Sequence, residues 1–319
     1  MFDRLQKNTF LVIGRAGLDL YADPPGTEGE SAATFSASLG GSAANIAVAI
    51  ARQGGGTALL TAVSNDAVGR YTTKALANYG VQTRYVKSVG GEARNTLAIV
   101  ETRPENCQSV IYRNGAADFE VSEADAAAVD YNAFAAVIVT GTSLARHPSR
   151  SATLKALHLA RAAGLVLIID IDYRPYSWAS KDEARMVCSQ TAGLCDIIVG
   201  NDDEFSVLAG SGGGIQLAKS MSHSPERIVV YKMGENGCTT FANAEQFDTP
   251  IFPVVALKPT GAGDGFMGGF ISGLVAGSDL PDALRWGAAT AAIVVTRVGC
   301  APAMPNSAEV RAFMQKFKV

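Results

Sequence analysis

The chain has 319 residues with a formal net charge of −3, and 48% of its residues are hydrophobic against 18% that are charged. This balance is typical of a globular protein with a large core, and it excludes a largely disordered chain. The small charge gives no reason to expect nucleic acid or an anionic membrane as a partner. The sequence has no apolar run of the ~18 residues that a membrane span needs, and its charged N-terminal decapeptide lacks the pattern of a secretion signal.

Short apolar runs alternate with segments of helical periodicity along most of the chain. Runs typical of buried strands lie at residues 10–14, 57–64, 135–142, 165–172, 196–201 and 227–234. Helical spacing is found at residues 45–55, 70–80, 149–163, 182–193, 263–277 and 281–299. This alternation predicts an α/β fold whose largely parallel sheet is covered by helices on both faces.

Two segments interrupt the alternation. Residues 17–39 show no helical period, and residues 93–115 contain two apolar runs separated by a turn at residues 104–106, a pattern that predicts a β-hairpin. We expect these segments to form a small β lid on a single domain that spans residues 1–319. The apolar strands of the hairpin would otherwise leave an exposed sheet edge, so we also expect a homodimer formed through the lid.

Polar clusters follow the predicted strands or precede predicted helices. In open parallel sheets, ligands bind beyond the carboxyl ends of the strands, so such clusters mark a candidate site. They are found at residue 19 and at residues 38–45, 170–178, 201–205, 232–237 and 259–266.

The run LKPTGAGDGFMGGF, at residues 257–270, places one carboxylate, Asp264, among five glycines. Glycine-rich backbone that leads into a helix N-terminus binds anions through its amide groups. A carboxylate in such a loop would repel a phosphate, so its presence indicates a role in the chemistry. Accepting a proton from an attacking hydroxyl, while the amides stabilise a transferring phosphoryl group, is such a purpose. A simpler alternative stays open at this point, namely a helix packed closely through its glycines with Asp264 as a capping residue.

Four segments together resemble the signatures of the ribokinase (PfkB) family of carbohydrate kinases. They are GGSAANIAVAIARQGG, NDDEF, KMGENG and PTGAGDGF, and they occur in the family's order between residues 40 and 266. The resemblance implies a ribokinase-like three-layer α/β/α fold and phosphorylation of a sugar hydroxyl with ATP and Mg²⁺.

The resemblance also implies roles for the residues that match these signatures. Asp264 would be the catalytic base, and the amides of Gly261, Ala262 and Gly263 would form an anion hole. Asn201 and Glu204 would organise Mg²⁺ through water molecules. The alternative for this last pair is a helix cap and its capping-box partner.

The two substrates would occupy neighbouring parts of the site. The residues implied to bind the sugar are Asp19, Gly41 and Asn45. The residues implied to lie along the nucleotide are Lys232, Gly234, Gly237, Thr260 and Gly263, with residues 298–305 on the adenine side. A helix cap is the alternative for Asn45, and a solvated strand end is the alternative for Lys232.

Three arginines bear on the class of sugar. Arg94, Arg113 and Arg174 lie near the predicted hairpin or at the carboxyl end of a strand, and a planar guanidinium suits bidentate binding of a carboxylate. We expect Arg113 and Arg174 to bind a sugar acid, although surface ion pairs are the alternative for each arginine.

Several longer segments, among them IGRAGLDLYADPPGT and DIDYRPYSW, resemble one branch of the family. That branch phosphorylates the 6-hydroxyl of 5-dehydro-2-deoxygluconate during inositol catabolism. Three alternatives remain: a 2-keto-3-deoxygluconate kinase, a kinase of a neutral sugar such as fructose or ribose, and a sugar-binding regulator without turnover.

Lys258 departs from the family pattern, because most members have an aspartate there that helps to ligate a monovalent cation. A lysine ammonium would supply a fixed positive charge instead, so we expect activity without added potassium; a side chain that points into solvent is the alternative. The five cysteines show no paired spacing, which indicates reduced thiols and a cytoplasmic location.

Overall fold

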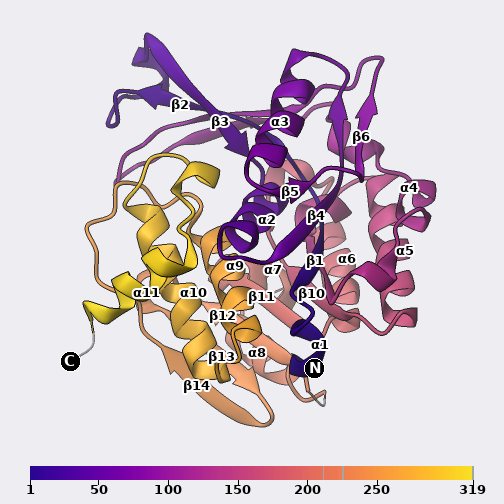
Figure 1. Ribbon diagram of the computed structural model, residues 1–319, viewed down its shortest axis with the longest axis vertical. Coiled ribbons are helices and arrows are strands. Elements are labelled where there is room, and N and C mark those ends of the chain that lie inside the picture. The colour runs from indigo at the N-terminus through magenta and orange to yellow at the C-terminus, as the bar shows by residue number, and fades with distance from the viewer. Residues whose placement is uncertain (211, 225, 318–319) are drawn as a thin grey trace.

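The computed structural model describes residues 1–210, 212–224 and 226–317, which form three layers with a central sheet between helices (Figure 1). The strands of this sheet follow the order β14-β13-β12-β11-β10-β9-β1-β4-β5, and β6 also pairs with β4. Their bounds are β1 Thr9–Ile13, β4 Gly56–Ser64, β5 Val81–Gln82, β6 Val86–Val89, β9 Ala136–Thr140, β10 Val166–Asp170, β11 Ile197–Asn201, β12 Ile228–Lys232, β13 Cys238–Ala242 and β14 Glu245–Thr249.

The helices cover both faces of the sheet. Their bounds are α1 Phe2–Leu5, α2 Ser42–Arg52, α3 Ala67–Asn78, α4 Glu123–Ala127, α5 Ser149–Ala162, α6 Lys181–Leu194, α7 Asp202–Ala209, α8 Gly214–Met221, α9 Ala262–Val275, α10 Leu280–Val295 and α11 Ser307–Gln315. Alternate residues of β1 enter two different cores, because successive side chains of a strand point to opposite faces. Phe10 and Val12 pack with residues of α2, α9 and α10, whereas Leu11 and Ile13 pack with residues of α5 and α6.

The predicted α/β architecture is confirmed, and the sheet is parallel from β12 through β5. The antiparallel edge formed by β13 and β14 was not predicted. Its turn consists of Asn243 and Ala244, both with positive φ values of 53° and 64°. In a sequence, a two-residue hairpin turn of this kind is usually identified by a glycine. An alanine occupies the second turn position here, so the hairpin could not be identified in this way.

The two interrupting segments form a small second sheet of order β3-β2-β7-β8, at the top of Figure 1. Its strands are β2 Gly17–Asp23, β3 Thr34–Gly40, β7 Thr96–Val100 and β8 Ser109–Tyr112. The predicted hairpin is confirmed, with β7 and β8 antiparallel and Val100 opposite Ser109. In the part of the chain that the structure describes, no helix is long and apolar enough to cross a membrane.

Candidate active site

The N-terminus of α9 is formed by the glycine run singled out in the sequence. Gly261 is the N-cap and has a φ of +84°, in the left-handed region that favours glycine. A Cβ atom at this position would lie 2.9 Å from the Sγ atom of Cys300. The first-turn amides of a helix have no partner within the helix and carry its positive dipole end, so this turn suits a phosphate group.

Asp264 lies in that first turn and is held by a second helix. The Nδ2 atom of the buried Asn45, on α2, donates a hydrogen bond of 2.8 Å to Oδ2 of Asp264. Burial, followed by the negative charge of Asp172, raises the pKa of Asp264 to about 7. A carboxylate with a pKa near neutrality is suited to accept a proton.

The start of α2 requires Gly41 beside the β1–β2 connection. Gly41 has a φ of +98°, and a Cβ atom there would lie 2.4 Å from the carbonyl oxygen of Arg15. This close approach brings the first turn of α2, and therefore Asn45, against the end of β1. The N-termini of α2 and α9 thus meet at the Asn45–Asp264 hydrogen bond.

Further acidic groups surround Asp264, and two cations only partly balance them. Nζ of Lys232 lies 4.0 Å from Oδ1 of Asp170, and Nη2 of Arg174 lies 2.8 Å from Oδ1 of Asp172. Burial lowers the pKa of Lys232, but Asp170 and Glu204 outweigh that effect and raise it. A Cβ atom on Gly263 would come within 3.3 Å of Lys232 Nζ, so this ammonium lies beside the anion-binding turn.

Asn201 and Glu204 form a capping box at the start of α7. Asn201 Oδ1 accepts from the Glu204 amide at 2.9 Å, and Glu204 Oε2 accepts from the Asn201 amide at 2.7 Å. Burial raises the pKa of Glu204 to about 7, and Asp170 adds to this effect. Among the described residues no three His, Cys, Asp or Glu side chains are grouped to hold a metal directly. The excess of carboxylates over cations nevertheless fits a divalent ion that keeps its water ligands.

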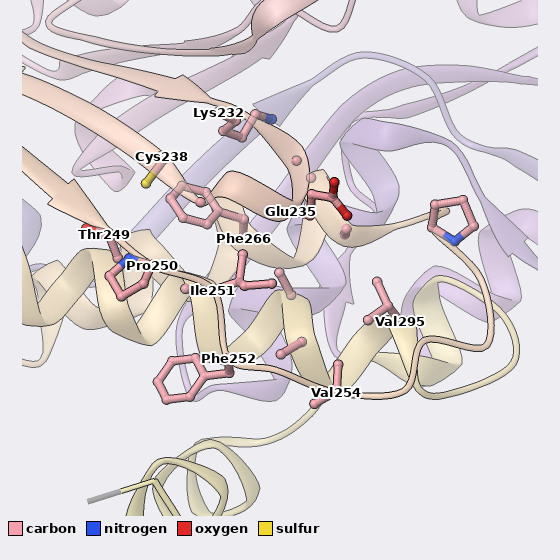
Figure 2. A pocket seen from close by; sticks show the side chains of 18 of the residues that line it. Lys232, Glu235, Cys238, Thr249, Pro250, Ile251, Phe252, Val254, Phe266 and Val295 are labelled. Atoms are coloured by element: carbon pink, nitrogen blue, oxygen red, sulfur yellow. The ribbon is translucent and has the colours of Figure 1, made fainter. Parts of the chain in front are cut away.

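A cavity of about 620 Å³ opens beside the first turn of α9 (Figure 2). Its polar side contains the predicted residues Asn201, Lys232, Gly234, Gly237, Ala262 and Gly263. Its apolar side contains Thr249, Ile251, Phe252, Val254, Phe266 and the α10 residues Ala288, Ala291, Ala292 and Val295. In Figure 2, Lys232 lies at one end of the cavity, and Phe252 and Val254 lie at the other. A charged end and an apolar end suit the phosphates and the base of a nucleotide.

Asp19 lies on β2, and its carboxylate is next to Gly40, which precedes the N-cap of α2. Asp19 is buried, and its Oδ2 accepts a 3.2 Å hydrogen bond from the hydroxyl of Tyr21, which also lies 3.2 Å from Cys300 Sγ. None of residues 298–305, expected on the adenine side, lines the cavity, and Cys300 packs against Tyr21 and Gly261. The segment contacts β3 of the small sheet, and the apolar wall is formed by residues 249–256 and α10.

The predicted arginines differ in how fully they are bound. Arg113 is buried and donates to Asp118, to the Thr142 carbonyl at 3.0 Å and to Ser177 Oγ at 3.2 Å. Arg94 is exposed and donates to the carbonyls of Gly91 and Ala93, each at 2.9 Å. Arg113 thus joins the loop after the small sheet to the main body, and only Arg174 lies among the carboxylates near Asp264.

Lys258 does not point into solvent. Its side chain is fully buried, and Nζ donates to the carbonyl oxygen of Thr260, immediately before the N-cap of α9. Burial lowers the pKa of Lys258, and Asp264 and Asp19 are among the groups that oppose this shift. Thr260 does not line the cavity, and its Oγ1 is buried without a hydrogen-bond partner in the described residues.

Sequence reasoning missed two parts of the site. The apolar wall comes from residues 249–256, which form no regular structure, and from one face of α10, where small residues gave no distinctive signal. Arg15, which is buried two residues beyond the end of β1, was also missed. Its position at the carboxyl end of a parallel strand was the available signal.

Comparison with known proteins adds to this geometry. The model of the pfkB family carbohydrate kinases matches residues 7–307. The chain is 38% identical to a 5-dehydro-2-deoxygluconokinase from Photobacterium profundum over 93% of its own length and 91% of that protein. It is 34% identical to a 5-dehydro-2-deoxygluconokinase from Geobacillus kaustophilus, over 99% of its length and 96% of that protein.

A solved structure supports the fold. The crystal structure of an Escherichia coli protein described as a putative ribokinase II, in complex with ATP and Mg²⁺, superimposes with a TM-score of 0.86. The match covers 97% of this chain and 99% of that chain at 24% sequence identity. The ribokinase-like fold expected from the sequence is confirmed.

Proposed function

The chain belongs to the PfkB family of carbohydrate kinases, and on that premise we propose that it transfers the γ-phosphoryl group of ATP to the 6-hydroxyl of 5-dehydro-2-deoxy-D-gluconate. One observation carries the proposal: Asp264 is oriented by Asn45 at the anion-binding turn of α9, beside a cavity with a charged and an apolar end. The names of the two relatives support the choice of sugar acid.

Different residues accept the proton, stabilise the transferring phosphoryl group and position the sugar. Asp264 accepts the proton of the 6-hydroxyl as its oxygen bonds to the γ-phosphorus and the bond to the departing ADP breaks. The amides of Gly261, Ala262 and Gly263 stabilise the charge on the transferring group, and Lys232 adds a positive charge beside them. Asp19, Gly41 and Asn45 position the sugar.

Magnesium accompanies the nucleotide in this proposal. When bound, the ion neutralises phosphate charge and orients the β- and γ-phosphates. Asn201 and Glu204 would hold it through water, with Asp170 nearby as a further negative group. Both oxygens of Glu204 already accept backbone amides, from Asn201 and Tyr173, so water-mediated contact fits this side chain better than direct ligation.

A direct assay tests the substrate. The purified protein is incubated with Mg·ATP and, separately, with 5-dehydro-2-deoxygluconate, 2-keto-3-deoxygluconate, fructose and ribose, and ADP formation is followed. We expect the highest kcat/KM with 5-dehydro-2-deoxygluconate. Preference for fructose or ribose would reject the sugar acid, and the absence of sugar-dependent ADP formation would favour a binding protein without turnover.

We further propose that the small sheet is a lid and a dimer interface. Val110 and Tyr112 on β8 and Phe35 on β3 are exposed by 51%, 56% and 38%, and β3 and β8 are the two edges of this sheet. Light scattering should give twice the chain mass, and Val110→Glu should reduce the measured mass to that of a single chain.

We also propose a cytoplasmic location, which the five unpaired cysteines support.

A further inference from the structure

The guanidinium of Arg15 is a buried cation that forms no hydrogen bond or ion pair with the residues that the structure describes. The residue is only 7% exposed, and its Nε atom is withdrawn from solvent. Burying an unpaired charge is unfavourable, so a folded protein retains one mainly where a ligand completes its interactions.

The surroundings of Arg15 place it in the sugar part of the site. Its carbonyl oxygen accepts from the Ala44 amide at 3.3 Å, which fixes its backbone against the first turn of α2. Burial raises the pKa of Asp19 and of Tyr176, and in both cases Arg15 is the strongest influence in the opposite direction. The guanidinium therefore lies near Asp19 on one side and near the half-exposed Tyr176 on the other.

The other predicted arginines in this region already have acidic partners, although the Nε atom of Arg113 is also buried without a hydrogen-bond partner in the described residues. Arg113 is bound by Asp118, Ser177 and Thr142, and Arg174 is paired with Asp172. Arg15 differs in having no acidic side chain paired with its fork in the described part of the chain, so this fork is available for an acceptor of matching shape. A carboxylate offers two parallel acceptor oxygens and is the group that this fork binds best.

We propose that Arg15 binds the carboxylate of the sugar acid and thereby determines the preference for acids over neutral sugars; this inference rests on the proposed function. The placement suits a substrate whose reacting hydroxyl and carboxylate lie at opposite ends. Arg15 enters from the β1–β2 connection and Asp264 from α9, and the first turn of α2 separates them. A six-carbon chain whose 6-hydroxyl meets Asp264 would thus present its carboxylate at the opposite end, toward Arg15.

The test compares two substrates that differ only at the carboxylate: 5-dehydro-2-deoxygluconate and its uncharged analogue with a CH₂OH group at that position. In Arg15→Met we expect kcat/KM for the acid to fall about 100-fold, mainly through KM. Values for the uncharged analogue and the KM for ATP should change by less than about threefold. Arg15→Lys should be intermediate, because it keeps the charge and loses the fork. Arg285→Met removes an exposed arginine on α10 and should behave as wild type.

Thermal unfolding gives a second measurement that does not depend on turnover. Because the Arg15 guanidinium forms no hydrogen bond or ion pair within the described part of the chain, Arg15→Met should unfold at the same or a higher temperature than wild type without ligand. The sugar acid should raise the Tm of wild type and Arg285→Met, but not that of Arg15→Met. A lower Tm without ligand would show instead that the guanidinium supports the fold, and would overturn the proposal.

The outcomes separate the two proposals. If wild type prefers the acid and Arg15→Met keeps that preference, or loses both substrates equally, Arg15 is not the carboxylate site and the proposed function stands. If wild type itself prefers the uncharged analogue, the proposed function fails, and the role of Arg15 fails with it. If Arg15→Met does not fold, Arg15→Lys decides by the same ratio of substrates.

Discussion

The nucleotide and sugar ends of the proposed active site are built in different ways. At the nucleotide end, the charged groups and amides come from two short runs, residues 232–237 and 261–264, and the wall behind them is apolar. At the sugar end, Arg15, Asp19 and Asn45 come from separate elements that meet only in the fold. The nucleotide end therefore depends on the local backbone shape of a few motifs, whereas the sugar end depends on individual side chains. Mutations at the two ends should affect KM for different substrates.

The largest effect should come from the residue that both ends share. Asp264→Asn removes the proton acceptor but keeps a similar shape and a partner for Asn45, so we expect kcat to fall about 10³-fold. The Kd for ATP, measured by calorimetry, should change little. Near-normal turnover would remove Asp264 from its role as base.

A change at the sugar end should alter the KM for the sugar only. Asp19→Asn removes the charge that is placed to bind sugar hydroxyls, and we expect the sugar KM to rise roughly 30-fold because charged hydrogen bonds are strong. The KM for ATP should remain close to wild type. An equal rise in both KM values would contradict the division of the site.

The matching change at the nucleotide end fills the cavity. Ala288 lines it from α10, and Ala288→Leu should raise the KM for ATP about tenfold, since the added side chain occupies space needed by the nucleotide. The sugar KM should not change. Ala312→Leu, on the exposed face of α11, is the matched control and should leave both KM values unaltered.

The pH profile tests the shared centre again. Burial raises the pKa of Asp264 to about 7, so the carboxyl group holds a proton below that pH and cannot accept another. Activity should therefore be gained as pH rises through about 7 and lost roughly tenfold per unit below it. The measurement is kcat/KM for the sugar between about pH 5.5 and pH 8.5. A flat profile down to about pH 5.5 would show that no group with a raised pKa limits catalysis.

The smallest expected effect concerns monovalent cations. Lys258 is buried with its ammonium on the Thr260 carbonyl, next to the anion-binding turn, so a positive charge is already fixed there. Turnover should be the same in sodium, potassium and cation-poor buffers. Lys258→Met should be less active in all three buffers, which confirms that the assay detects loss of this charge. Strong activation of wild type by potassium would contradict the prediction.

The sequence was most informative where a motif determines its own backbone. The glycine run predicted the α9 turn because Gly261 needs a positive φ and a close approach to Cys300. The alternation of apolar runs predicted the parallel sheet, because buried strands and covering helices have different periods.

The remaining features depend on tertiary contacts. Whether an arginine is paired is decided by its neighbours in the fold, so the sequence could not show that Arg113 pairs with Asp118 or that Arg15 is buried. The apolar wall of the cavity was hidden for a similar reason, because Ala288, Ala291 and Ala292 are also ordinary helix-packing residues. The capping box at Asn201 and Glu204 could be foreseen, but its relation to Lys232 and Asp170 required the register of β10, β11 and β12.

The hydrogen bond between Asn45 and Asp264 joins residues that are 219 positions apart. During synthesis, the ribosome completes the first of these residues long before the second. Any product of premature termination upstream of residue 264 lacks the carboxylate entirely. If Asp264 is the proton acceptor that we propose, shortened chains of this kind cannot transfer phosphate at this site.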